Sequence, residues 1–167
     1  SNCQFGFGVP FVGGNEAYYQ ILHEQMGYPK WKWDYDFGLK TIEHLKKGKI
    51  LDIGAGSGYF LSALPKGLIK YAVESTPTMV NELEKKGITC YSDFNQLLNN
   101  EAGQFDAITM FQVLEHISEF KYILQSCYTL LKPNGKLIVT VPNADSMFKQ
   151  EQIIGHADMP PNHINKW

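Results

Sequence analysis

The sequence predicts an α/β fold in which a doubly wound parallel sheet carries helices on both faces, and two observations lead to this prediction. From residue 48 onward, five apolar segments of strand length alternate with segments of helical periodicity. Strands that are separated by helices pair in parallel, and right-handed crossovers then place helices on both faces of one sheet. The chain has 167 residues, which suits a single domain with one core.

The residues before the first strand are expected to pack on this core. Residues 1–15 are rich in Gly, Phe and Pro and show no period, so we expect an irregular arm. Asn15 can cap a helix over residues 16–26, and a second helix is predicted over residues 35–46. The second helix is expected to face inward with Phe37, Leu39, Ile42 and Leu45. We interpret the nearby aromatic side chains as packing against the sheet, with a lid over a pocket as the alternative; they are Trp31, Trp33, Tyr35 and Phe37.

The strands and helices of the core follow in regular order. The predicted strands are residues 49–53, 69–74, 88–91, 105–110 and 136–141. The helices between them are expected to end near residue 64 and to cover residues 77–86, 94–98 and 119–131. Pro133-Asn134-Gly135 predicts a turn before the last strand. A further helix is expected over residues 146–154, followed by a loop over residues 155–167.

Composition and charge argue against several partners. The formal net charge is −2 and the isoelectric point lies near 6.2, unlike the basic surface of a nucleic-acid-binding protein. The cysteines are scattered and none has C-x-x-C spacing, so we expect no metal site and reduced thiols. The longest apolar runs are too short to span a bilayer. We therefore expect a cytoplasmic protein that binds neither nucleic acid nor a membrane.

The most informative segment is residues 50–60, where an apolar strand runs into a loop with glycines at positions 54, 56 and 58. Glycines there let the backbone turn sharply and approach a ligand closely. A dinucleotide fingerprint G-x-G-x-x-G would place its third glycine at position 59, where this chain has Tyr59. The spacing therefore favours a ligand without phosphates and argues against an NAD(P)-dependent oxidoreductase.

Two acids stand at the ends of neighbouring strands. Asp52 precedes the glycine loop, where a carboxylate can meet a cationic or hydroxyl-bearing ligand group, or can cap backbone amides instead. Glu74 ends the second strand, twenty residues after Gly54, where an acid can accept hydrogen bonds from both hydroxyls of a ribose. The alternative for Glu74 is a solvated strand end.

Four ordered blocks of the sequence share one resemblance. They are Leu51–Gly58, Glu74, Phe105–Ile108 with Val113–His116, and Leu130–Leu137. At this spacing they resemble the class I S-adenosylmethionine-dependent methyltransferases over residues 48–142. The chain is most similar to the branch that contains the ubiquinone-biosynthesis O-methyltransferases and many small-molecule methyltransferases.

The resemblance implies a Rossmann-like sheet with strand order 3-2-1-4-5. It also implies three regions: an N-terminal part (1–47), an S-adenosylmethionine-binding core (48–142) and a C-terminal helix and loop near the acceptor (143–167). The antiparallel strands that usually follow the fifth strand in this family are not visible in the sequence. An exposed sheet edge makes a homodimer plausible.

The resemblance further implies which residues bind S-adenosyl-L-methionine and its product S-adenosyl-L-homocysteine. The glycine loop would hold the amino-acid end, Asp52 would lie near the amino group, and Glu74 would bind the ribose. The full set expected to bind the cofactor is Asp52, Gly54, Ala55, Gly56, Ser57, Gly58, Tyr59, Phe60, Glu74, Ser75, Thr76, Met79, Asp93, Phe94, Phe111 and Gln112.

Histidines are the candidates for removing a proton from a small-molecule acceptor, because imidazole titrates near neutrality. The candidates are His116, His156 and His163, each with a structural role as the alternative. Residues 160–163 resemble a segment that lies on the substrate side in some family members, although Asn162 departs from it. A non-catalytic adenosylmethionine-binding module stays open as a further alternative.

Overall fold

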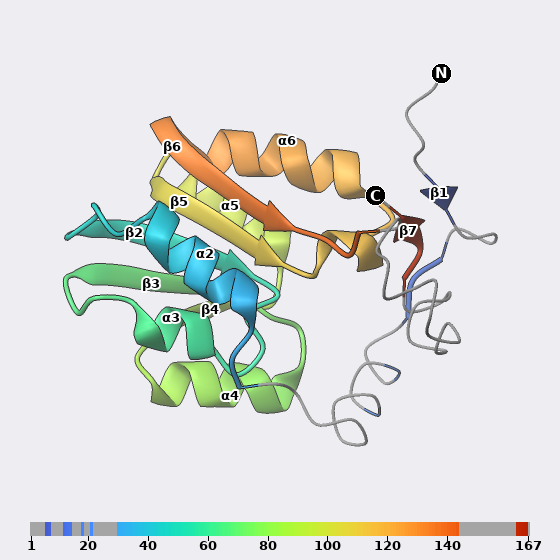
Figure 1. The fold of residues 1–167 in the computed structure, drawn as a ribbon, viewed down its shortest axis with the longest axis horizontal. Helices are drawn as coiled ribbons and strands as arrows, with labels where there is room; N and C mark the ends of the chain where they lie inside the picture. Colours follow the sequence, from blue (N-terminus) through green and yellow to red (C-terminus); the bar gives the residue numbers. More distant parts are fainter. Residues whose placement is uncertain are drawn as a thin grey trace.

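The computed structural model describes residues 6–7, 12–14, 18, 21, 30–143 and 163–166, and its centre is a five-stranded sheet (Figure 1). The strands are β2 (Gly48–Ile53), β3 (Leu68–Val73), β4 (Thr89–Tyr91), β5 (Phe105–Phe111) and β6 (Leu131–Thr140). They run in the order β4-β3-β2-β5-β6, and every neighbouring pair is parallel. The predicted fold class and strand order are confirmed.

Helices cover both faces of this sheet, as predicted. They are α2 (Trp33–Thr41), α3 (Tyr59–Ala63), α4 (Pro77–Lys85), α5 (Phe94–Glu101), α6 (Phe120–Leu130) and the short 3-10 helix η1 (Leu114–His116). Tyr35 of α2, Phe60 of α3 and Leu83 of α4 belong to one apolar cluster. Leu97 of α5 and Cys127 of α6 belong to a second cluster on the other face. The sheet is therefore the middle layer of three (Figure 1).

Helix α2 differs from its prediction in its bounds and in the side it buries. It begins at residue 33 and ends at residue 41, and Tyr35, Gly38 and Ile42 are buried at helical spacing. Phe37 lies off this stripe and is 54% exposed, so the prediction that it faces inward is wrong. The other residues predicted to face inward, Leu39, Ile42 and Leu45, do pack on the core. The interpretation that these aromatic side chains pack against the sheet therefore holds for Tyr35. It does not hold for Trp31, Trp33 and Phe37, which are exposed.

The turn predicted at residues 133–135 lies inside β6. This strand begins at Leu131, which pairs with Phe105, and the register shifts before Lys136 joins the ladder. Asn134 has a φ of 65°, a left-handed value that asparagine tolerates better than most residues. The prediction of a turn followed by a strand is therefore corrected to one irregular strand. Helix α5 also runs further than predicted, to Glu101.

A short segment near each end of the chain contributes to a small separate sheet. β1 (Gly6–Phe7) pairs antiparallel with β7 (Asn165–Lys166). The predictions of an irregular arm and a terminal loop are wrong at these residues, because each contributes backbone hydrogen bonds to the other. The helices predicted over 16–26 and 146–154 lie outside the described residues, except that Tyr18 and Ile21 are helical. No helix in the described ranges is both long and apolar enough to cross a membrane.

Candidate functional site

The candidate site lies where the carboxyl ends of β2, β3 and β5 meet. Ile53 at the end of β2 is level with Val73 at the end of β3 and with Met110 of β5. The loops that follow these strands therefore leave the sheet side by side. In open parallel sheets this edge is where ligands bind.

The glycine loop needs glycine for its backbone and for its packing. Gly54, Gly56 and Gly58 have φ values of 72°, 52° and 72°, which side chains disfavour. A Cβ at Gly54 would lie 2.6 Å from a methyl of Val113, and one at Gly58 would lie 2.5 Å from a methyl of Leu83. The loop is therefore a tight turn, and its backbone amides lie at the edge of the sheet.

Glu74 connects the glycine loop to the loop that follows β3. Its Oε2 accepts a hydrogen bond from the Gly56 amide at 2.9 Å. Its Oε1 accepts from the amides of Ser75 and Thr76 at 2.9 and 3.0 Å. A carboxylate offers about four lone-pair sites, so these contacts hold Glu74 in place and leave it able to accept from a further donor. The alternative of a free, solvated strand end does not describe this geometry.

Asp52 is buried on the face of the sheet that α2 covers. It is 3% exposed, and its Oδ1 accepts a hydrogen bond from the Thr109 hydroxyl at 2.7 Å. Burial raises the pKa of Asp52 from 3.8 to about 7; Glu74 and Asp34 raise it as well, whereas Thr109 and Lys32 lower it. Among the described residues, the carboxyl thus accepts from a hydroxyl and not from backbone amides, which was the alternative to a ligand role for Asp52. A cation placed beside it would stabilise its charged form.

The turn after β5 carries backbone strain at the same edge. Gln112 has a φ of 57°, and its amide donates to the Thr140 carbonyl at 3.0 Å. A left-handed residue other than glycine costs about 1 kcal/mol or more and concentrates at functional sites. Phe111, which precedes it, is buried and packs on Phe60 with ring centroids 4.7 Å apart. The side chains of Phe60 and Phe111 therefore pack against each other in the core next to this edge.

Several further residues expected to bind the cofactor lie in the glycine loop and in the helices α3 and α4 next to it. The Ser57 hydroxyl lies 3.1 Å from the sulfur of Met79. Lys86 donates to the Ser57 carbonyl and lies 5.2 Å from the centre of the Tyr59 ring. Ala55 is buried in the core cluster. These contacts join the glycine loop to α4, on the side of the site next to β3.

Asp93 and Phe94 lie beyond the end of β4, and the structure gives both of them structural contacts. Asp93 caps α5 by accepting from the Asn95 amide at 2.8 Å. The Phe94 ring lies 6.5 Å from that of Tyr122. Their strand end does lie beside Glu74, whose amide donates to the Tyr91 carbonyl at 3.1 Å.

Two of the three candidate histidines meet beside η1. His116 and His163 have ring centroids 4.9 Å apart. Glu115 is 1% exposed, and its Oε1 lies 3.9 Å from His116 Nε2 and 4.0 Å from His163 Nε2. The possible ligand atoms of these three groups lie within 4.8 Å of one another, a set that could hold a metal ion. His156 lies outside the described residues.

The C-terminal strand holds this histidine pair together. The Ile164 amide donates to the Glu115 carbonyl at 2.9 Å. The Asn165 side-chain amide donates to the carbonyls of Leu114 and Ile117 at 3.1 and 2.8 Å. His163 therefore reaches η1 through long-range contacts.

Sequence reasoning missed Glu115, Thr109 and Asp34 among the buried polar groups of this edge. Thr109 could have been found from strand alternation, because it lies two residues after the inward-facing Ala107. Asp34 gave no such signal, since an acid in the first turn of a helix normally faces solvent and favours the helix dipole.

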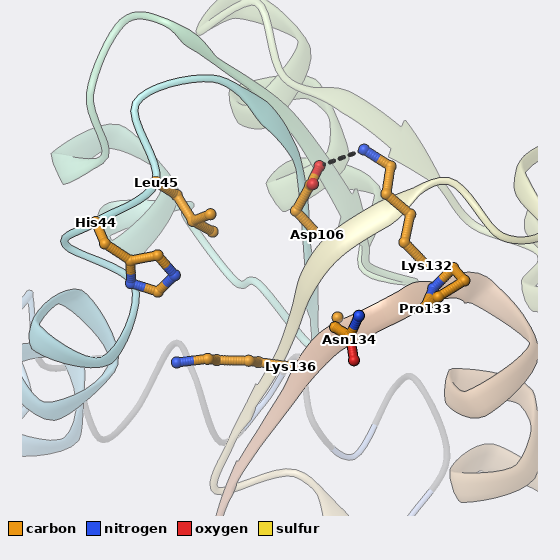
Figure 2. Close-up of a pocket in the computed structure, with 8 residues that line it drawn as sticks. His44, Leu45, Asp106, Lys132, Pro133, Asn134 and Lys136 are labelled. Carbon is orange, nitrogen blue, oxygen red and sulfur yellow. Dashed lines mark hydrogen bonds and ion pairs between the residues drawn. The ribbon is translucent and has the colours of Figure 1, made fainter.

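A pocket at the opposite edge of the sheet offers a contrast (Figure 2). It is lined by His44, Leu45, Asp106, Lys132, Pro133, Asn134, Gly135 and Lys136. Asp106 accepts hydrogen bonds there from the Lys132 ammonium at 2.7 Å and from the Lys49 amide at 2.8 Å. Asp106 and Lys132, two charged groups of this pocket, therefore satisfy each other.

This sheet order, with a glycine loop and two acids at the carboxyl edge, defines an α/β protein with a nucleotide-type site. The family described as methyltransferase domain matches residues 34–167. The chain belongs to this family.

Individual proteins agree with this assignment. A ubiquinone biosynthesis O-methyltransferase of Coxiella burnetii is 30% identical over 127 residues, covering 70% of this chain and 54% of that protein. The crystal structure of the YcgJ protein from Bacillus subtilis has a TM-score of 0.64 at 22% identity, covering 79% of this chain and 61% of that one. A SAM-dependent methyltransferase from Archaeoglobus fulgidus has a TM-score of 0.63 at 21% identity, covering 80% and 62%. These structures show the shared fold, and the chain spans about half the length of the curated relatives it matches.

Proposed function

We propose that this chain is the cofactor-binding core of an S-adenosylmethionine-dependent methyltransferase that acts on a small-molecule acceptor. The observation that carries the proposal is the link between the glycine loop and Glu74 at the carboxyl edge of the sheet. Family membership supports the same activity. It gives no support to the oxidoreductase alternative.

The residues at this edge fit the cofactor. Glu74 is held by backbone amides and would accept hydrogen bonds from the ribose hydroxyls. Gly54 to Gly58 would bring their backbone close to the amino-acid end, and the buried Asp52 would lie near its ammonium. Tyr59 stands where the dinucleotide fingerprint has its third glycine, which favours a ligand without phosphates.

The protein's contribution to methyl transfer would be alignment and exclusion of water. The bound cofactor supplies a methyl group that is already activated by the sulfonium. The buried Phe60 and Phe111 form a rigid apolar floor at the edge where that group would lie. Holding donor and acceptor in line on such a floor removes much of the entropic barrier.

We infer that the acceptor is a small molecule with a hydroxyl group, and that the histidine pair takes its proton. The curated relatives are named O-methyltransferases, which supports an oxygen nucleophile. His116 lies in η1, shortly after β5, and His163 is brought beside it from the residues next to β7. Glu115 would stabilise the imidazolium that forms when either ring accepts a proton. The three-region division, the cytoplasmic location and a homodimer remain predictions.

Calorimetric titration with S-adenosylhomocysteine and, separately, NADH tests the cofactor. Binding of the first ligand alone is expected, at micromolar affinity, and it should weaken at least tenfold in Glu74→Gln. The matched control is Glu82→Gln, which removes an exposed acid from α4 and should leave affinity unchanged. Binding of NADH, or of neither ligand, would contradict the proposal.

Turnover with catechol as the probe acceptor tests the histidines. Of the variants His116→Ala and His163→Ala, the one that removes the base should lower kcat by about 10²–10⁴. The dissociation constant of S-adenosylhomocysteine should be unchanged in both. We expect EDTA to leave wild-type activity intact, and loss of activity in EDTA would instead assign the three groups to a metal ion. Cofactor binding without turnover of catechol would favour the non-catalytic module.

A further inference from the structure

Asp34, in the first turn of α2, has a carboxylate that is only half satisfied. The residue is 1% exposed. Its Oδ2 accepts a hydrogen bond from the Thr140 hydroxyl at 2.9 Å, whereas its Oδ1 is buried and has no partner among the described residues. Burying such an oxygen without a donor is costly, so the position calls for a donor that the described residues do not supply.

Close packing holds this turn of α2 over the candidate site. The Tyr35 ring lies 5.7 Å from that of Phe60 and 5.2 Å from that of Phe111. A Cβ at Gly38 would lie 2.6 Å from the Phe111 ring, so the helix sits directly on the end of β5. Asp34 is therefore held near the carboxyl ends of β5 and β6.

The charges around Asp34 also point to a ligand with both signs of charge. Asp34 raises the pKa of the buried Asp52, and Lys32 lowers it, so the charges of both residues act on that carboxyl. Two buried carboxylates that repel each other are stabilised when a cation lies between them. The α2 end of the site thus presents two acids and one lysine, which complements the ammonium and carboxylate of a free amino-acid group.

We propose that Asp34 binds the α-ammonium of the cofactor through its Oδ1 and shares that ammonium with Asp52. This inference rests on the proposed function, and it adds a residue of the N-terminal helix to the site. Gln112 donates to the Thr140 hydroxyl at 3.3 Å, and that hydroxyl donates to Asp34. This chain of hydrogen bonds orients the carboxylate so that its second oxygen faces the ligand.

A purely structural role is the competing explanation, in which Asp34 only ties α2 to β6. The two explanations differ for a ligand that lacks the ammonium. S-Adenosylhomocysteine without its α-amino group is 5′-S-(3-carboxypropyl)-5′-thioadenosine. It keeps the adenosine, the thioether and the carboxylate, so it isolates the one group that Asp34 is proposed to bind.

Calorimetry of Asp34→Asn with both ligands tests the proposal. Asparagine keeps an oxygen for Thr140, but its amide N–H would face the ammonium. Affinity for S-adenosylhomocysteine should fall about 10- to 100-fold, as expected for a lost charge-assisted hydrogen bond, and affinity for the deamino analogue should not fall. Asp36→Asn is the matched control, because Asp36 is an exposed acid of the same helix that bonds Trp31.

Each outcome decides the question. Equal losses for both ligands, or no loss for either, would overturn the proposal. If Asp34→Asn does not fold, Thr140→Val is the second variant, because it removes the hydrogen bond that orients the Asp34 carboxylate. It too should lose affinity for S-adenosylhomocysteine and keep its affinity for the deamino analogue. Failure of the proposed function is distinct, since wild-type protein would then bind neither ligand.

Discussion

The two edges of the parallel sheet use the same kinds of residue in opposite ways. At the amino edge, Asp106 of β5 is bound by Lys132 and by a backbone amide, and these bonds lower its pKa although burial alone would raise it. At the carboxyl edge, burial raises the pKa of Asp52 of β2 to about 7. Paired charges contribute to folding, whereas a carboxylate buried beside another costs folding energy. The difference is what we expect if the carboxyl edge binds a ligand, as proposed above.

The largest effects on stability are expected from Asp52, through its pH dependence. Because its pKa is raised from 3.8 to about 7 on folding, the folded state holds the proton over a range where the unfolded state has lost it. The free energy of unfolding should therefore fall as pH rises from about 4 to 7, by up to about 4 kcal/mol. Denaturant titrations of wild type and Asp52→Asn across this range measure it, and equal slopes for both proteins would contradict the assignment.

The affinity for S-adenosylhomocysteine should depend on pH through Asp52 in the opposite direction to stability. If Asp52 meets the ammonium, affinity for S-adenosylhomocysteine rises with pH as Asp52 ionises near pH 7. Calorimetry at pH 5.5 and 8 should show this rise in wild type and lose most of it in Asp52→Asn. An affinity that is independent of pH in wild type would remove Asp52 from the ligand site.

Gly58→Ala should have the next largest effect. The new methyl would meet both a φ of 72° and Leu83 at 2.5 Å. Overpacking costs about 1–3 kcal/mol in addition to the strain of a left-handed alanine, and binding of S-adenosylhomocysteine should be lost. Gly87→Ala is the control, because Gly87 has the same φ with no atom within 4 Å. Equal destabilisation of the two variants would show that packing against Leu83 is unimportant.

A smaller effect is expected from Asp106→Asn at the amino edge. The pKa of Asp106 is lowered on folding, so its stabilisation is present above the unfolded pKa and is lost as pH falls. The variant should be less stable by about 1 kcal/mol at pH 7, since Lys132 is partly exposed and the pair is screened. The difference from wild type should shrink toward pH 3, opposite in sign to Asp52. Cofactor affinity should not change.

Local sequence patterns predicted most of the fold and the residues of the glycine loop. The doubly wound parallel sheet follows from the alternation of strands and helices and from crossover handedness, whereas the strand order came from the resemblance to the methyltransferases. Gly54, Gly56 and Glu74 are local features of strand ends. Phe37 was misplaced because its neighbours Tyr35 and Gly38 fix the buried side of α2 through contacts with Phe111. Such contacts join distant parts of the chain and leave no periodic signal.

The same limit applies to the polar groups of the site. His163 reaches Glu115 only because β7 pairs with β1 and Asn165 bonds the carbonyls of η1. The link between Asp34 and Thr140 spans 106 residues. Spacing in the sequence predicted which strand ends carry acids, but only the folded chain shows which of them share a buried environment.

The smallest effects are expected from the two non-glycine residues with left-handed backbones, which lie at opposite edges. Gln112 has a φ of 57° and Asn134 a φ of 65°. Glycine at either position relieves strain, so Asn134→Gly should change the free energy of unfolding by less than about 0.5 kcal/mol and leave binding intact. Gln112→Gly also loses the bond to Thr140 that orients Asp34. Its affinity for S-adenosylhomocysteine should therefore fall a few-fold without loss of stability. Equal affinities in the two variants would show that Gln112 does not contribute to ligand binding.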